Sequence, residues 1–227
     1  MRCHFITFLF VTLLPVFWAG VSKTQVQVPE TYEDSLKWRE RAAEAGNAKA
    51  QYQLGQILDL GLKVETNKRK AAEWYGKAAA QGHAEAQMRL ARMYYDGDGI
   101  TGDLSRALNL YGLAAKAGIP QAQFNCAVML EAGAGVTRNL SEAAKFYEQA
   151  ALGGFKEAQL NLAMLHARGG GVKLDLNQAM IWLEVAIAGG AKVPKNVYNS
   201  LRSTLTPTQR DEVRAKAQKL EAKIAER

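Results

Sequence analysis

Glycine recurs every 36 residues along this chain, and this period constrains the fold more than any other feature of the sequence. The glycines that share one register are Gly46, Gly82, Gly118, Gly154 and Gly190. An Ala-Gln pair follows each of the first four glycines at the same distance, beginning at Ala50, Ala86, Ala122 and Ala158. A repeat of this length is typical of solenoids, in which each repeat is one supersecondary unit and neighbouring units stack.

Each row of 36 residues contains two helical patterns, which in the first row cover about residues 47–60 and 68–81. In the second pattern Ala71, Trp74, Tyr75 and Ala78 lie at i, i+3, i+4 and i+7, which is one face of a helix. A glycine pair follows the first pattern in the later rows, at Gly97/Gly99, Gly133/Gly135 and Gly169/Gly171, whereas the first row has Gly61 and Lys63. Glycine ends a helix readily because it accepts the left-handed conformation. The predicted caps of the second helices are Asn67, Asp103, Asn139 and Asp175.

The recurring motifs resemble those of the Sel-1-like repeat family, a relative of the tetratricopeptide repeats. The first row carries Ala50-Gln-Tyr-Gln-Leu-Gly55 and Ala71-Ala-Glu-Trp-Tyr-Gly-Lys-Ala-Ala79, and the match extends over about residues 31–190. The resemblance implies an all-α fold, a right-handed α-solenoid of about four and a half 36-residue helix-turn-helix repeats with a C-terminal capping helix. We therefore place the repeats at residues 30–190 and a degenerate repeat with the capping helix at residues 191–227.

The predicted capping helix begins near Pro207. Thr206 and Gln209 have the spacing of a capping box, and proline suits the first turn of a helix. An apolar stripe along this helix consists of Val213, Ala217, Leu220 and Ile224. We expect the stripe to cover the open end of the solenoid, because a terminal repeat has no neighbour to bury its hydrophobic face.

The first 22 residues have the order of a secretory signal peptide. Arg2 precedes an apolar run over residues 5–19, and the small residues Gly20 and Ser22 follow. We predict a signal peptide at 1–22 and a linker at 23–29, with an uncleaved membrane anchor as the alternative. The expected location is the bacterial periplasm or the exterior of the cell, and a eukaryotic secretory protein is the less favoured source.

No catalytic, cofactor or metal site is predicted. The segment from Gly97 to Gly102 fits a dinucleotide-binding glycine pattern, but a helix rather than a strand is expected before it. Three nearby aspartates lack the remaining ligands of a calcium loop, and His83 and His166 lie in different repeats. After removal of the signal peptide Cys126 is the one cysteine, which excludes an internal disulfide and favours a small buried hydrophobe.

Basic charge is concentrated at the C-terminal end. From Ala191 onward the chain has 9 basic and 4 acidic residues, whereas residues 23–190 are almost balanced. The charge distribution therefore predicts no nucleic-acid groove. The basic tail is either a solvated helix face or a contact for an anionic lipid or polymer, so membrane contact is expected only there or through an uncleaved N-terminal segment.

Partner binding is expected on the concave face, which the first helix of each repeat lines in helical solenoids. One position there is occupied by Tyr52, Met88, Phe124 and Leu160, and the position one turn later by Gln56, Arg92, Val128 and Met164, with Glu131 nearby. Methionine and aromatic side chains suit a protein or peptide ligand. The alternative for the apolar members is packing between helices.

These features predict a non-enzymatic interaction scaffold or adaptor. One alternative is a secreted protein that binds or hydrolyses β-lactams, as the resemblance suggests for cysteine-rich members, but the single mature cysteine departs from their pattern. The other is a membrane-tethered structural component of an envelope machine.

Overall fold

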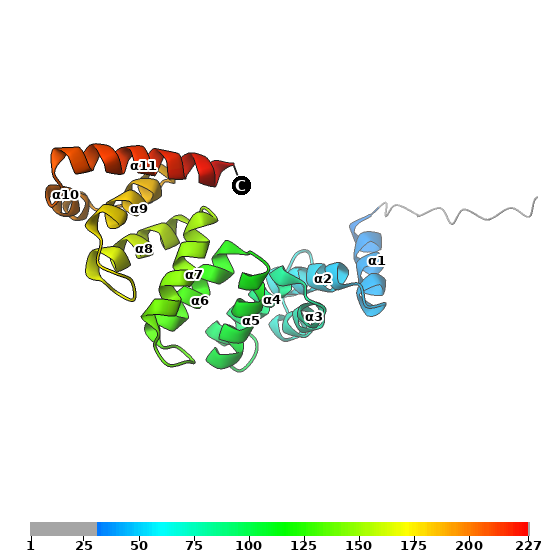
Figure 1. The fold of residues 1–227 in the computed structure, drawn as a ribbon. Helices are drawn as coiled ribbons and strands as arrows, with labels where there is room; N and C mark the ends of the chain where they lie inside the picture. The colour runs from blue at the N-terminus through cyan, green and yellow to red at the C-terminus, as the bar shows by residue number, and fades with distance from the viewer. Residues whose placement is uncertain (1–30, 227) are drawn as a thin grey trace, which may run out of the picture.

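A computed structural model describes residues 31–226, which form eleven α-helices and no strand (Figure 1). The predicted signal peptide and linker lie outside the described residues. The helices are α1 (Tyr32–Glu44), α2 (Ala48–Leu60), α3 (Lys68–Ala80), α4 (Ala84–Asp96), α5 (Leu104–Lys116), α6 (Pro120–Ala132), α7 (Leu140–Leu152), α8 (Lys156–Arg168), α9 (Leu176–Ala188), α10 (Lys195–Ser203) and α11 (Pro207–Ala225). Within this part of the chain, no helix combines the length and apolar character needed to cross a bilayer.

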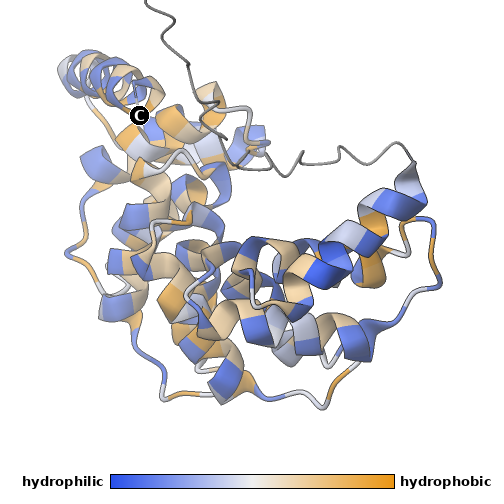
Figure 2. Ribbon diagram, turned by 90° about the vertical axis from the view of Figure 1, so that its right-hand side faces the viewer, coloured by the Kyte–Doolittle hydropathy of each residue, from blue (hydrophilic) through white to orange (hydrophobic). Residues whose placement is uncertain are grey.

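Four hairpins, α2–α3, α4–α5, α6–α7 and α8–α9, follow one another in chain order, and each packs against the next. Helix α1 occupies the place of a second helix that precedes the first full repeat, in agreement with the leading half-repeat. A view at right angles shows that the row of hairpins curves into an arc, with hydrophobic and hydrophilic residues interspersed along each helix (Figure 2). The structure confirms the predicted α-solenoid.

Local sequence signals set the helix boundaries. All four predicted caps accept a hydrogen bond from a backbone N–H in the first turn, as Asn67 Oδ1 does from Lys70 at 3.0 Å. The first helices end at left-handed glycines with φ between 66° and 73° at Gly61, Gly97, Gly133 and Gly169. The predicted caps and the predicted glycines at the helix ends are both confirmed. They could be predicted from the sequence because each acts on backbone groups within one turn of the helix end.

The repeated glutamines join each unit to the helix before it. Gln51 Nε2 donates to the carbonyl oxygen of Ala43 at 3.0 Å, and the equivalent bonds of the later glutamines measure between 3.1 and 3.2 Å. The four glutamines are buried, and their acceptors lie in the last turns of α1, α3, α5 and α7. The last carbonyls of a helix have no partner inside the helix, and each of these four accepts both from the backbone N–H of the glycine three residues later and from the glutamine amide. The glutamine thus adds a bond that links the two units at their junction.

Alanine and tyrosine fill the core. The repeated alanines at Ala71, Ala107, Ala143 and Ala179 have no exposed surface. Tyr75, Tyr111 and Tyr147 are also buried, and the last repeat has Leu183 at this position. Small residues permit close approach of helices, and the larger side chains fill the space between units.

The C-terminal end differs from a stacked hairpin. The capping box of Thr206 and Gln209 is present, and the predicted stripe on α11 packs on the core, with Val213 and Ala217 buried. However, α11 packs along α9, whereas α10 touches α9 only lightly. The long last helix therefore takes the place beside α9 that the first helix of a fifth repeat would occupy.

Candidate functional site

The candidate interaction surface, called here the first-helix surface, is the solvent-facing side of α2, α4, α6 and α8. The first predicted set of binding residues, Tyr52, Met88, Phe124 and Leu160, is half-buried there. Tyr52 stacks on the ring of His83 with centroids 4.6 Å apart. The ring of Phe124 contacts the ring of Phe155 in a tilted arrangement, with centroids 5.0 Å apart. His83 and Phe155 begin the next repeat, so these positions join adjacent units and expose only part of each side chain.

The second predicted set changes character along the solenoid. Gln56 donates to the Tyr52 hydroxyl at 2.9 Å, and the exposed Arg92 pairs with Asp96 at 3.2 Å. In contrast, Val128 and Met164 are half-buried and pack against the C-terminal core. The first two repeats therefore present polar groups at this position, and the last two present apolar groups.

Glu131 lies half-buried at the end of α6. The hydroxyl of Tyr147 donates to its carboxylate at 2.8 Å, and Arg168 of the next repeat lies 3.9 Å away. The same arrangement occurs in the first repeat, where the Tyr75 hydroxyl donates to Asp59 at 3.2 Å. A tyrosine of the second helix thus reaches the last turn of the first helix at the edge of the first-helix surface.

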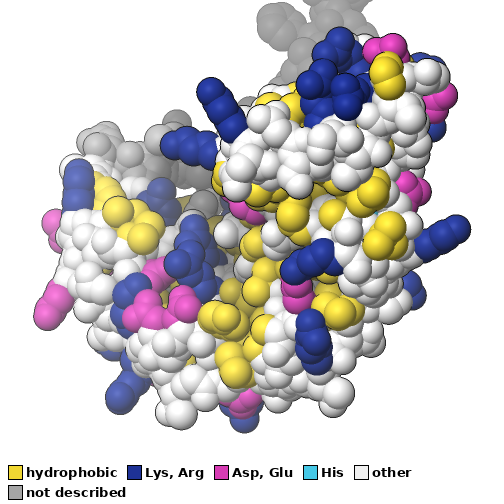
Figure 3. Space-filling model, turned by 90° about the vertical axis from the view of Figure 1, so that its left-hand side faces the viewer, with side chains coloured by type: hydrophobic (Ala, Val, Ile, Leu, Met, Phe, Trp, Pro, Cys, Tyr) yellow, Lys and Arg dark blue, Asp and Glu magenta, His cyan; other side chains and the backbone are white. Residues whose placement is uncertain are grey.

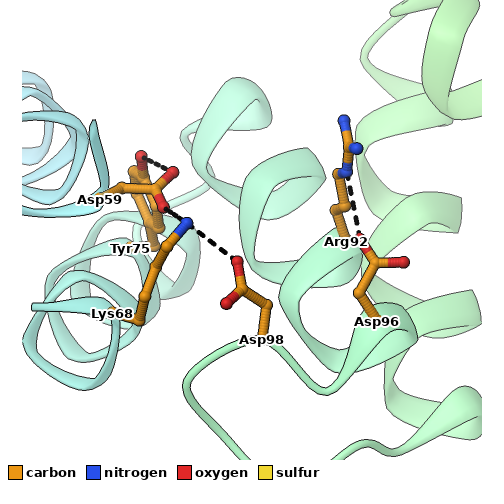
Figure 4. Close-up of polar contacts among 6 residues, drawn as sticks. All are labelled: Asp59, Lys68, Tyr75, Arg92, Asp96 and Asp98. Carbon is orange, nitrogen blue, oxygen red and sulfur yellow. Dashed lines mark hydrogen bonds and ion pairs between the residues drawn. The ribbon is translucent and has the colours of Figure 1, made fainter. Parts of the chain in front are cut away.

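A charged pocket lies between the first two repeats, and Figure 4 shows the polar contacts of its carboxylates with Lys68 and Arg92. Its volume is about 180 Å³, and its charged lining consists of Asp59, Lys68, Arg89, Arg92, Asp96 and Asp98. The Lys68 ammonium lies between two carboxylates, 2.6 Å from Asp59 and 2.9 Å from Asp98. The hydrogen bonds that the ammonium donates to Asp59 and Asp98 raise the pKa of Lys68. Lys68 therefore stays charged and holds the Asp98 loop against the preceding repeat.

Arg89 is the member of this pocket whose hydrogen bonding is incomplete. Its Nε atom is buried and has no hydrogen-bond partner. The predicted binding set includes Met88 and omits Arg89, although Arg89 is the next residue on the same helix. Its equivalents Asn125 and Asn161 are also polar and half-buried. The first row has Gln53 at this register, so a polar residue in all four rows is the sequence signal that identifies this position.

Burial keeps three tyrosines of the second helices, Tyr75, Tyr111 and Tyr147, in the protonated form. It raises the pKa of Tyr75 and Tyr147 far above the usual value, and it raises the pKa of Tyr111 to about 12 with the help of Asp96. The hydroxyls are therefore neutral donors at physiological pH. Burial also raises the pKa of the Cys126 thiol to about 12, which keeps the thiol protonated and poorly nucleophilic.

Among residues 31–226, no three His, Cys, Asp or Glu side chains are grouped closely enough to hold a metal ion. His83 instead caps α4 and lies 3.2 Å from Glu85. The arrangement of the first-helix surface is suited to hydrogen bonding, ion pairing and apolar contact with another molecule.

Comparison with known proteins identifies the class. The fold and the regularly spaced surface residues are those of a helical repeat protein that presents a row of first helices. The Sel1 repeat model matches residues 28–47, 48–83, 84–119, 120–155 and 156–190, and the chain belongs to the Sel1 repeat family. No match was found among curated proteins.

Two solved structures illustrate the similarity. A Sel1 repeat protein from Oxalobacter formigenes is 34% identical, with a TM-score of 0.64 over 70% of this chain and 63% of that chain. A protective antigen of uropathogenic Escherichia coli strains that displays an SLR fold is 28% identical, with a TM-score of 0.54 over 87% of this chain and 50% of that chain. The chain thus spans between half and two thirds of the length of these relatives. Sel1 repeat proteins are generally protein-interaction scaffolds and typically non-enzymatic.

Proposed function

We propose that this protein is an exported, non-enzymatic adaptor that binds a protein or peptide partner on the first-helix surface, on the concave side of the solenoid. The observation that carries the proposal is a contrast within the repeat. Residues that build the junctions are the same in every unit, as the buried Ala-Gln pairs show, whereas the surface positions differ from unit to unit. Repeated residues satisfy a common architecture, and varied residues at exposed positions give each unit a different contact.

The first-helix surface is polar in the first two repeats and apolar in the last two, which supports a partner segment that carries both polar and apolar side chains. The first two repeats offer the charged pocket and Arg92, and the last two offer Val128 and Met164. A segment that lies along the surface would place charged or polar groups near α2 and α4 and apolar groups near α6 and α8. Well-packed apolar anchors beside satisfied polar contacts are the usual source of affinity in protein interfaces.

Site-specific photocrosslinking in cells tests this proposal. A photoreactive amino acid replaces Arg92 in one variant and Val128 in another, and Glu148, which is exposed on α7, is replaced in the matched control. We expect both first-helix variants to capture the same partner and the control to capture none of it. Capture of that partner only from Glu148 would move the site to the second helices.

Export is a separate part of the proposal and has a separate test. Its support is the order of charged, apolar and small residues in the first 22 positions. N-terminal sequencing of the protein recovered from cell fractions is expected to begin after Ser22 in the periplasmic or extracellular fraction. An intact N-terminus in the membrane fraction would favour the tethered alternative, and an intact N-terminus in the cytoplasm would refute export.

A further inference from the structure

A cationic pocket lies at the C-terminal end of the solenoid, and none of the predicted binding residues lines it. It lies between α9, α10 and α11, is open to solvent, and has a volume of about 210 Å³. Three arginines line it, Arg202 from α10 and both Arg210 and Arg214 from α11. Two carboxylates, those of Glu184 and Asp211, also line it.

The three arginines have little of their hydrogen-bonding capacity in use. None of them takes part in any of the ion pairs within 4.0 Å found among residues 31–226. Arg210 uses only its Nε atom, which donates to the Arg202 carbonyl oxygen at 3.1 Å. The Glu184 carboxylate accepts from the Tyr198 hydroxyl at 2.7 Å instead. The arginine forks are therefore available to an external carboxylate, which they bind with favourable geometry.

An apolar pocket lies directly beside the cationic one. The two share Glu184 and Tyr198 in their linings, and the second pocket, of about 670 Å³, is also formed by Ile187, Val193 and Pro194. The Ile187 side chain is exposed although it is large and hydrophobic. Figure 3 shows the molecule from the left-hand side of Figure 1. In this view Lys and Arg side chains gather at the top, the level of α11 in Figure 1, and hydrophobic side chains lie below them.

The charge balance of the two pockets is strongly positive. Lys192 and Lys195 line the apolar pocket, so five cationic side chains face two carboxylates across the pair. Pro207 places the first turn of α11 at the cationic pocket, and the positive end of the helix dipole adds to the potential there. Complementary charge at an interface favours an acidic partner and disfavours a basic one.

We infer that the two pockets form a docking site for a segment of a partner protein in which a carboxylate side chain lies next to an apolar side chain. The carboxylate enters between Arg202 and Arg214, and the apolar group packs against Ile187 and Val193. A peptide fits better than a lipid bilayer because the apolar groups line hollows. Membrane-bound surfaces instead project apolar side chains outward into the acyl region. This site is independent of the first-helix surface, so either can be present without the other.

Fluorescence anisotropy with defined peptides tests the inference on the full-length protein. The probe is a labelled hexapeptide, Asp-Asp-Phe-Leu-Asp-Asp, and the comparison probes replace aspartate with asparagine or with lysine. We expect the acidic probe to bind at least about tenfold more tightly than the asparagine probe, because a tenfold ratio is a modest share of the affinity of a protein interface. We expect no binding of the lysine probe. Equal binding of the three probes would overturn the inference.

Matched variants locate the binding. Arg202→Glu combined with Arg214→Glu is expected to weaken binding of the acidic probe at least about tenfold. The control combines Lys216→Glu with Lys219→Glu, which changes the net charge equally on exposed residues of α11 outside both pockets. Circular dichroism confirms that both proteins are folded. Equal weakening by the two pairs would show that only general electrostatic attraction is present.

The apolar half and the membrane alternative have their own tests. Ile187→Asp is expected to weaken binding of the acidic probe, because the substitution places a carboxylate in the apolar pocket. Sedimentation with phosphatidylserine vesicles and with phosphatidylcholine vesicles measures lipid binding. Two results together would identify a lipid site in place of the peptide site. The protein would bind the phosphatidylserine vesicles but not the acidic peptide, and the Arg202→Glu/Arg214→Glu pair would abolish the vesicle binding.

Discussion

The second glycine of each loop pair gives a sharp test of how the repeats stack. Gly171 has φ +77°, and a Cβ atom added there would lie 2.3 Å from the backbone of Leu140, which begins the second helix of the preceding repeat. Gly118 has a similar φ of +86°, but a Cβ atom there would meet no atom within 4 Å. Comparison of Gly171→Ala with Gly118→Ala therefore separates the contact between units from the backbone conformation.

The two substitutions share every effect except the contact. A left-handed alanine is less stable than a left-handed glycine by about 1–2 kcal/mol. Replacement of glycine also restricts the unfolded chain, which offsets part of this loss. Gly118→Ala should therefore reduce the free energy of unfolding by about 1 kcal/mol. Gly171→Ala should reduce it by a further 1–3 kcal/mol, roughly the loss on overpacking, because the Leu140 backbone has to move.

Urea denaturation followed by far-ultraviolet circular dichroism measures both values. The comparison requires that the dependence of the unfolding free energy on urea concentration be the same in the three proteins. If the two variants lose the same free energy to within about 0.5 kcal/mol, the typical scatter for surface substitutions, the close contact between the loop and the preceding repeat is refuted.

Three further predictions concern stability. Ala143→Arg places a charge at a fully buried contact between helices and should reduce the free energy of unfolding by about 3 kcal/mol or more. The control Ala132→Arg, at an exposed position, should change the free energy of unfolding by less than about 0.5 kcal/mol. An unchanged melting temperature of Ala143→Arg would contradict the stacked structure. Gln123→Leu removes the side-chain hydrogen bond to the carbonyl oxygen of Ala115, which keeps its bond from the Gly118 backbone N–H. The free energy of unfolding in urea denaturation should therefore fall by about 0.5–1.5 kcal/mol, and no loss would mean that this bond does not hold the units together. Burial raises the pKa of Tyr111 from 10.0 to about 12, so the folded state binds the proton more tightly than the unfolded state. The contribution of Tyr111 to stability should be intact below pH 10 and should fall by about 1.4 kcal/mol per pH unit between pH 10 and about 12. The buried Tyr75, Tyr147 and Cys126 add losses of the same sign, so the test is whether Tyr111→Phe loses stability less steeply than the unchanged protein over this range in urea denaturation; identical slopes would contradict the prediction.

The sequence determined the elements of the fold. The 36-residue period, the capping side chains and the glycines predict the hairpins, and the observed helices begin and end within about a residue of the predicted ranges, as Lys68–Ala80 shows. The capping box at Thr206 was also predictable, since its hydrogen bonds join residues three positions apart. These features depend on backbone groups within one turn, so a short stretch of sequence contains all the information needed.

The candidate sites depended on contacts between distant residues. The spacing identified Tyr52 as a surface position, but only the structure shows its ring stacked on His83, 31 residues later. The same holds for the charged pocket, in which Lys68 joins two repeats. The exposure of a side chain depends on how the repeats stack. A pattern within one helix does not show which residue of the next repeat covers a given side chain.

The C-terminal end shows this division most clearly. The amphipathic stripe of α11 and its basic residues were evident in the sequence, which therefore specified a capping helix and an excess of positive charge. Only the tertiary structure decided that α11 takes the place beside α9 and that α10 is displaced, which brings Arg202 and Arg214 together around a pocket. Helix formation is local, whereas the choice between two helices for one hydrophobic face depends on the area that each can bury against the completed solenoid.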